Sequence, residues 1–175
     1  MLRLAALAVA ITLLAFPAAQ SQTVDDPALL AQLKRLFPDA ASFSAKSGNP
    51  PHFKAFAAAA SGQDPEVLGL AYWTTELEPL ERAYDGPIKM LVGMDTAGVL
   101  TGIIVTDHRE PYGYFSVDLP EFARQFEQKS IRDRFQVGTD VDAVTRATIT
   151  VTSASRAVRN SSRRIARAYL VPPEQ

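Results

Sequence analysis

Two apolar runs separated by four residues constrain the fold more than any other part of the sequence. The runs cover residues 88–94 and 99–106, and they flank the tetrapeptide Asp95-Thr96-Ala97-Gly98. An aspartate that opens a turn and a glycine that closes it favour a type I turn with the glycine in a left-handed conformation. The segment Ile88–Asp107 is therefore predicted to form a long β-hairpin, which requires an antiparallel sheet.

The other periodic segments predict a helix near each end of the chain and strands between them. Leu29, Leu33 and Leu36 recur at helical spacing, and either Asp25 or Asp26 is expected to cap their helix. The predicted elements are a helix over Pro27–Phe37, strands over His52–Ala58 and Glu66–Thr75, a helix over Leu119–Lys129, an irregular segment or short strand over Phe135–Val141, and a helix over Thr152–Leu170. This order predicts the α+β class, with a mainly antiparallel twisted sheet that contains the hairpin and is packed by an N-terminal helix and two C-terminal helices.

Residues 1–21 have the pattern of a secretory signal peptide. Arg3 precedes a mostly apolar run from Leu4 to Phe16, and small residues then lead to a cleavage site expected between Ala19 and Gln22. The run is shorter than the about 20 residues that a membrane-spanning helix needs, although an uncleaved anchor is the alternative. The sequence predicts export to the periplasm or beyond, with one mature domain over residues 22–175 and no transmembrane segment within it.

Composition limits the chemistry that the chain can perform. Its 175 residues include no cysteine and only two histidines, His52 and His108. Disulfides, thiolate metal centres, iron–sulfur clusters and thiol nucleophiles are therefore excluded, and no metal site is expected. Redox activity in such a chain requires an organic cofactor. No G-x-G-x-x-G sequence and no phosphate-binding P-loop occurs, so neither nucleotide fingerprint applies.

Positive charge gathers toward the C-terminus. The segment from Thr152 to Gln175 holds five arginines and one acidic residue, Glu174. The arginines lie on one predicted helix and lack interleaved aromatic residues, so they do not predict a nucleic-acid interface. A docking face for an acidic redox partner and a solvated helix face are the two interpretations of this charge run.

The stretch from Asp142 to Thr150 places several hydroxyls just ahead of the last predicted helix. The N-terminus of a helix has unpaired N–H groups and the positive end of the helix dipole, so an anion such as a phosphate group is stabilised there. The alternative is that Thr150, Thr152 or Ser153 simply caps the helix. Spacing alone does not separate a bound anion from an ordinary cap.

The same stretch resembles the flavinylation motif of FMN-binding domains, D-x-x-[S/T]-G-A-T followed by x-[S/T]. Asp142, Thr145, Ala147, Thr148 and Thr150 stand at matching positions. The resemblance implies that the hydroxyl of Thr148 is esterified to the phosphate of FMN, a reaction that a transferase of the ApbE type performs from FAD. It also implies that this transferase is a partner during maturation.

One position of the motif departs from the family. Arg146 stands where the family usually has glycine. If the glycine is needed for a positive φ or for close approach of the transferase, arginine hinders the modification. In the other interpretation, the Arg146 guanidinium pairs with the flavin phosphate.

Further segments resemble the flavin domain of NosR, the regulator of nitrous-oxide respiration, and more distantly the flavin subunits RnfG and NqrC. They are residues 36–40, 48–51 and 78–107 and the sequence His108-Arg109-Glu110-Pro111. By this resemblance, His108 and Glu110 are expected to contact the flavin ring or relay its proton, and Tyr112 to cover the ring by stacking. A solvated turn and ordinary rim aromatics are the alternatives for these side chains.

Two functions follow from these observations. The first is an exported flavoprotein with covalent FMN that carries electrons between partner proteins, including membrane-bound ones, and converts no substrate itself. The second is a non-redox accessory or binding protein that keeps the fold without the flavin. Arg146 is the feature that favours the second function.

Overall fold

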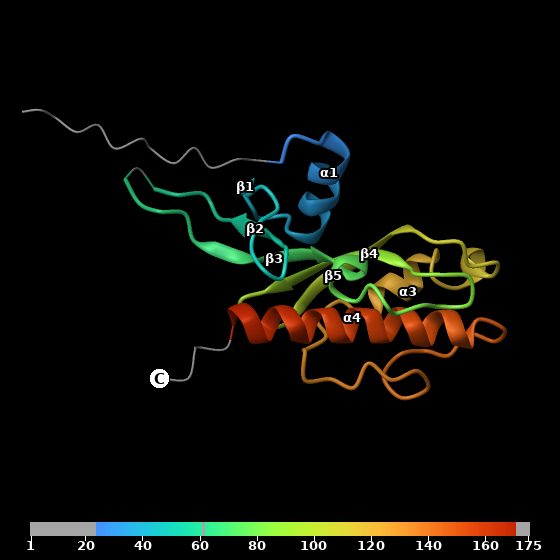
Figure 1. Ribbon diagram of the computed structural model, residues 1–175. Helices are drawn as coiled ribbons and strands as arrows, with labels where there is room; N and C mark the ends of the chain where they lie inside the picture. The colour runs from blue at the N-terminus through green and yellow to red at the C-terminus, as the bar shows by residue number, and fades with distance from the viewer. Residues whose placement is uncertain (1–23, 61, 171–175) are drawn as a thin grey trace, which may run out of the picture.

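The centre of the fold is a five-stranded antiparallel sheet in which every strand pairs with its neighbour in sequence (Figure 1). The computed structural model describes residues 24–60 and 62–170. The strands are β1 (Ser42–Phe43), β2 (Phe53–Phe56), β3 (Val67–Trp73), β4 (Lys89–Asp95) and β5 (Leu100–Asp107). The helices are α1 (Pro27–Leu36), α2 (Thr74–Leu77), α3 (Pro120–Arg124) and α4 (Thr148–Tyr169), with a 3₁₀ turn, η1, at Gly113–Phe115. The predicted α+β class and antiparallel sheet are confirmed.

Alternating side chains divide the core into two layers, one on each face of the sheet. In β4, Met90 and Val92 pack with α4, whereas Leu91 packs with α1 on the opposite face. Successive residues of a strand point to opposite faces, so a sheet covered on both sides carries a nearly continuous apolar run. Figure 1 shows the result, with α4 lying along one face of the sheet and α1 on the other.

The predicted hairpin is confirmed as β4 and β5. Gly98 has φ +80°, which is the left-handed conformation expected at that position. The Asp95 carboxylate accepts hydrogen bonds from the backbone N–H groups of Ala97 and Val99, at 2.9 and 2.8 Å. The aspartate that opens the turn therefore also holds its backbone in place.

The predicted helix α1 and its cap are also confirmed. The Asp26 carboxylate accepts a hydrogen bond from the N–H of Ala28, and Pro27 occupies the first helical position. The predicted strands before the hairpin correspond to β2 and β3.

The helix predicted over Leu119–Lys129 is wrong in length, because α3 ends at Arg124. Beyond it, Gln128 has φ +62°, which no α-helix accommodates. The N–H of Gln128 donates to the Leu100 carbonyl, and the N–H of Leu100 donates to the Lys129 carbonyl. Pairing with the edge of β5 therefore replaces the last turns of the expected helix.

The signal peptide predicted over residues 1–21 lies outside the described residues, and so does its cleavage site. Among the helices of residues 24–60 and 62–170, none combines the length and the apolar character that a membrane crossing requires.

The surroundings of His52 predict that the stability of the fold depends on pH. Its side chain is buried, its Nδ1 lies 3.0 Å from the Pro50 carbonyl oxygen, and its ring packs against Tyr169. Burial lowers the pKa of His52 below its ordinary value of 6.5, the Pro50 hydrogen bond partly opposes this, and Lys54 adds to it. The unfolded chain therefore binds a proton more readily than the folded chain does.

We expect the free energy of unfolding to fall as the pH decreases from 7 to 5. The measurement is urea unfolding at a series of pH values, with His52→Gln as the comparison. The variant should lose most of this slope, and an unchanged slope in His52→Gln would assign the effect to other groups.

Candidate functional site

Helix α4 begins at Thr148, four residues earlier than predicted. The residue that precedes its first turn is Ala147, whose side chain has no hydrogen-bond acceptor, and the first bond of the helix runs from the Val151 N–H to the Ala147 carbonyl. The N–H groups of Thr148, Ile149 and Thr150 therefore precede the hydrogen-bonded ladder. The alternative that Thr150, Thr152 or Ser153 caps this helix is wrong, since all three lie within it.

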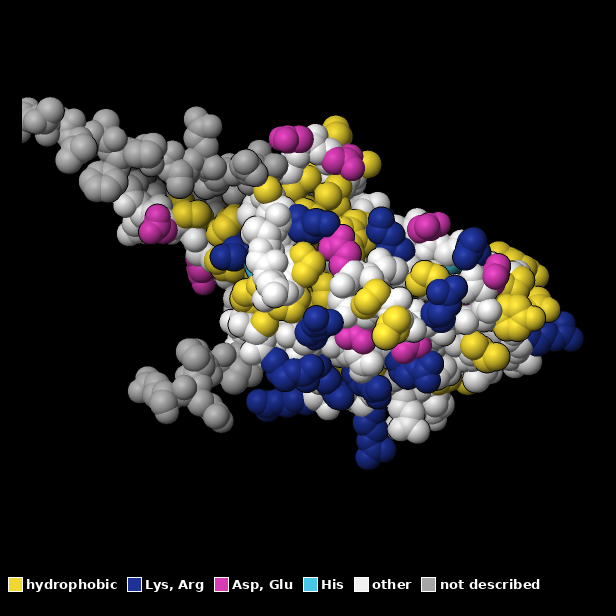
Figure 2. Space-filling model, viewed as in Figure 1, with side chains coloured by type: hydrophobic (Ala, Val, Ile, Leu, Met, Phe, Trp, Pro, Cys, Tyr) yellow, Lys and Arg dark blue, Asp and Glu magenta, His cyan; other side chains and the backbone are white. Residues whose placement is uncertain are grey.

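A cavity of about 270 Å³ opens at this helix start. It brings together Thr148 and Tyr112, which the sequence analysis proposed as site residues, with Tyr84, which it did not. Tyr84 and Tyr112 are 69% and 44% exposed, and Ile149 is 60% exposed. The lining residues are Tyr84, Tyr112, Arg146, Ala147, Thr148, Ile149 and Thr150. In Figure 2, exposed hydrophobic side chains gather at the end of the molecule where α4 begins.

Glu110 holds two distant parts of this site together. The side chain is only 6% exposed. Its carboxylate accepts hydrogen bonds from the backbone N–H groups of Tyr84 and Asp85, at 3.2 and 2.7 Å, and from the hydroxyl of Thr150. Glu110 is not among the residues that line the cavity. Glu110 therefore lies behind the cavity wall and connects residues 84–85 to Thr150 of α4; we call these three hydrogen bonds the Glu110 brace. The expectation that Glu110 touches the flavin ring remains a prediction.

His108 faces another hollow. Its Nε2 lies 2.7 Å from the Asp118 carboxylate, and its Nδ1 accepts a hydrogen bond from the backbone N–H of Glu110 at 3.1 Å. A Cβ added at Gly113 would come within 2.1 Å of the imidazole, so glycine permits this close packing. The hollow beside His108 is lined by residues 105–108 and Asp118, and none of these lines the Thr148 cavity.

A family comparison identifies the segment that builds this cavity. Residues 83–162 match the family model described as the FMN-binding domain. The chain contains an FMN-binding domain. The match includes Tyr84, the Glu110 brace and Tyr112 as well as the Thr148 helix start. No curated protein matches the chain.

The sheet extends beyond the matched part of the FMN-binding domain. Strands β1 to β3 and helix α1 precede residue 83. Strand β3 pairs with β4, with Trp73 opposite Leu91 at one end of the pairing and Gly69 opposite Asp95 at the other. These earlier elements therefore share one sheet with the matched segment. The prediction that the domain covers all of residues 22–175 goes beyond the match and stays a prediction.

Asp142 and Thr145 match the flavinylation motif but do not line the cavity. Both are exposed, and the backbone N–H of Asp142 donates to the side-chain carbonyl of Gln125 at 2.6 Å. Thr150, in contrast, lines the cavity and binds Glu110. Tyr84 lies in the segment 78–107 that resembles the family, but it was not proposed as a site residue. Its place in the cavity depends on the side chain of Glu110, 26 residues later.

The cavity of the FMN-binding domain fits the phosphate end of FMN. Thr148 is exposed and is the first residue of α4, where the N–H groups and the helix dipole favour negative charge. Arg146 adds a guanidinium to the lining, and the exposed tyrosines offer faces for a flat ring. The volume of about 270 Å³ lies just below the usual range of ligand sites, about 300–1,000 Å³, so a flavin ring would rest partly on the surface. The family assignment and this fit support a flavin-binding protein.

Arg146 adopts the backbone conformation that glycine favours. Its φ is +70°, and this left-handed region costs residues with a Cβ about 1–2 kcal/mol. The loop therefore keeps the shape that the family's glycine allows, at some expense in stability. Its side chain also lines the cavity, which is the placement needed for pairing with a phosphate.

Two substitutions at Arg146 separate the backbone from the side chain. Both Arg146→Gly and Arg146→Val remove the guanidinium, but only glycine tolerates φ +70° without strain. We expect Arg146→Gly to be more stable than Arg146→Val by about 1–2 kcal/mol. Urea unfolding of the two proteins measures this difference, and equal stabilities would show that the loop changes conformation.

Proposed function

We propose that this chain is an exported flavoprotein in which FMN is linked through its phosphate to the hydroxyl of Thr148, and that it acts as an electron carrier. One observation carries the proposal. Thr148 is an exposed threonine and the first residue of a long helix that has no side-chain cap. It lines a cavity together with the guanidinium of Arg146 and two tyrosines. This cavity lies within the segment that matches the FMN-binding domain.

The chemistry of the linkage agrees with its surroundings. In the transfer, the Thr148 hydroxyl oxygen replaces AMP on the flavin-side phosphorus of FAD, AMP leaves, and the hydroxyl proton passes to a base of the transferase. The resulting phosphodiester keeps one negative charge beside the start of α4 and within the same cavity as Arg146. Both the helix dipole and the guanidinium stabilise that charge.

The role of an electron carrier is favoured over that of an enzyme. Bound FMN exchanges electrons singly or in pairs, so the protein contributes attachment, orientation and access. The residues that line the cavity include no carboxylate and no imidazole. The lining therefore offers no carboxylate or imidazole that could act as an acid or base on a separate substrate.

Export and the pathway are the remaining parts of the proposal. The pattern of residues 1–21 supports removal of a signal peptide and a place outside the cytoplasm. A covalent bond suits that location because it prevents loss of the flavin. The NosR-like segments support a place in a respiratory chain with protein partners.

Co-expression with an ApbE-type transferase tests the proposal. After denaturation and gel electrophoresis, the band should fluoresce as flavin, and its intact mass should include one FMN moiety. A colourless band without added mass would overturn the proposal and favour the accessory protein without flavin. The departure at Arg146 is the observation that favours that second candidate.

A further inference from the structure

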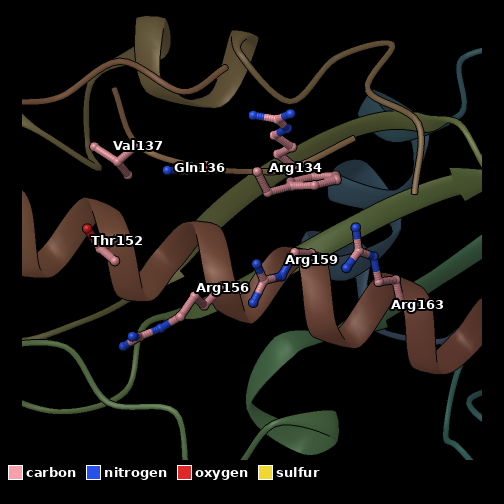
Figure 3. A pocket seen from close by; sticks show the side chains of 8 residues that line it. Arg134, Gln136, Val137, Thr152, Arg156, Arg159 and Arg163 are labelled. Atoms are coloured by element: carbon pink, nitrogen blue, oxygen red, sulfur yellow. The ribbon is translucent and has the colours of Figure 1, made fainter. Parts of the chain in front are cut away.

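A second cavity, of about 450 Å³, lies between α4 and the irregular segment before it. Four arginines line it. Figure 3 shows that Arg156, Arg159 and Arg163 come from α4, whereas Arg134 comes from the neighbouring segment. The other lining residues are Phe135, Gln136, Val137 and Thr152. None of the eight lines the Thr148 cavity, so the two sites are distinct.

Among the residues that the structure describes, a carboxylate neutralises only one of the four positive charges. Arg156 binds Glu81 at 2.8 Å, and in Figure 3 its side chain points away from the segment that carries Arg134. Arg163 donates to the backbone carbonyls of Ile131 and Asp133, at 2.8 Å each. These carbonyls position the guanidinium and leave its charge uncompensated.

The remaining two arginines keep most of their donors available. Arg159 donates through Nε to the Asn160 side chain at 3.1 Å, so its terminal nitrogens are left for other acceptors. Arg134 has no hydrogen bond or ion pair to any other residue that the structure describes. Arg134, Arg159 and Arg163 therefore place three charges around one cavity that no carboxylate within residues 24–60 and 62–170 neutralises.

We propose that this arginine cavity binds a small organic polyanion with two or three carboxylate or phosphoryl groups. Guanidinium groups match both kinds of anion through paired N–H donors. Like charges held together repel each other, and a ligand of opposite charge removes that repulsion. Three negative charges would balance the charges of Arg134, Arg159 and Arg163, and two would balance most of them.

The shape of the cavity favours a small molecule over a protein or nucleic acid. Its volume lies within the range of small-molecule sites, about 300–1,000 Å³. Phe135, which is buried, and Val137 give it an apolar part that a carbon skeleton can contact. Positive charge also extends over the surface around the cavity, since Lys and Arg side chains lie along α4 (Figure 2). That wider charge attracts anions toward the cavity from solution.

Calorimetric titration of the full chain with citrate and with pyrophosphate tests the proposal. The ionic strength is held constant, and sulfate serves as the reference for general anion effects. At least one polyanion should bind with a stoichiometry of one and more tightly than sulfate. Citrate alone would identify a carboxylate ligand, and pyrophosphate alone a phosphoryl ligand. Binding no tighter than that of sulfate would overturn the proposal. Polyglutamate is titrated in parallel as an acidic polypeptide, and its binding without binding of citrate or pyrophosphate would also overturn the proposal.

Matched variants locate the binding. Arg134→Gln and Arg159→Gln should each raise the dissociation constant of the polyanion by about tenfold or more, because each substitution removes a charged hydrogen-bond donor. Arg132→Gln and Arg167→Gln are the controls, since these arginines lie on the same segments but do not line the cavity. Equal losses in controls and test variants would show that the overall charge, and not this cavity, binds the anion. Thermal unfolding without ligand confirms that each variant is folded.

Discussion

Thr148→Val should abolish covalent flavin completely. Valine matches threonine in shape and branching, so α4 can still begin at this position, but it has no oxygen to attach to phosphorus. Thr148 is exposed, and the exchange leaves no buried polar group unpaired. In-gel flavin fluorescence and intact mass after co-expression with the transferase measure the result. We expect no fluorescence and the mass of the unmodified chain.

Two further variants make the assignment specific. Thr148→Ser keeps the hydroxyl and should keep the flavin. Thr152→Val removes a hydroxyl one helical turn later and should also keep it, because Thr152 lines the arginine cavity instead. Label that persists in Thr148→Val, or that disappears in Thr152→Val, would contradict the choice of Thr148.

Glu110→Ala should lower the free energy of unfolding by about 3 kcal/mol or more. The substitution leaves three donors without their acceptor, namely the N–H groups of Tyr84 and Asp85 and the hydroxyl of Thr150. Each lost hydrogen bond to a charged group costs about 1.5–3 kcal/mol, and partial access of water to residues 84 and 85 reduces the sum. Urea unfolding measures the loss.

Glu121→Ala is the control for this experiment. Glu121 pairs with Arg124 on the surface of α3, with both side chains more than half exposed, and such pairs contribute between 0 and about 1 kcal/mol. A loss in Glu110→Ala no larger than in Glu121→Ala would show that the brace is not needed for stability. A partly folded Glu110→Ala protein should also accept less flavin, because the wall at Tyr84 is no longer held near α4.

The sheet could be predicted because its signals are local. The hairpin needed only two apolar runs and the Asp95–Gly98 turn, and α1 needed only its leucines and a capping aspartate. The ends of α3 and α4 depended on tertiary contacts instead. Residues 148–152 are all β-branched, which disfavours a helix in isolation. Burial of Thr150 and Val151 against the rest of the protein stabilises the helix there nevertheless.

The site could be predicted only where the motif runs along the chain. Ala147 and Thr148 were identified because they are neighbours in sequence and match a family pattern. Tyr84 was missed because a buried carboxylate from another segment places it, and neither periodicity nor spacing encodes that contact. The sequence indicated a left-handed backbone at Arg146 only because the family usually has glycine there, since an arginine by itself does not predict a positive φ.

Under the proposed function, the Glu110 brace implies an order of events during maturation. It joins the segment at residues 84–85 to α4, and α4 can dock only after its buried residues as far as Ala166 are available to the sheet. An incompletely folded chain presents Thr148 without a helix start, without the wall at Tyr84 and without Arg146 held beside it. If FMN is attached to Thr148 as proposed, a transferase that requires this assembled surface acts last, and the attached flavin then marks a molecule that was folded when it was modified.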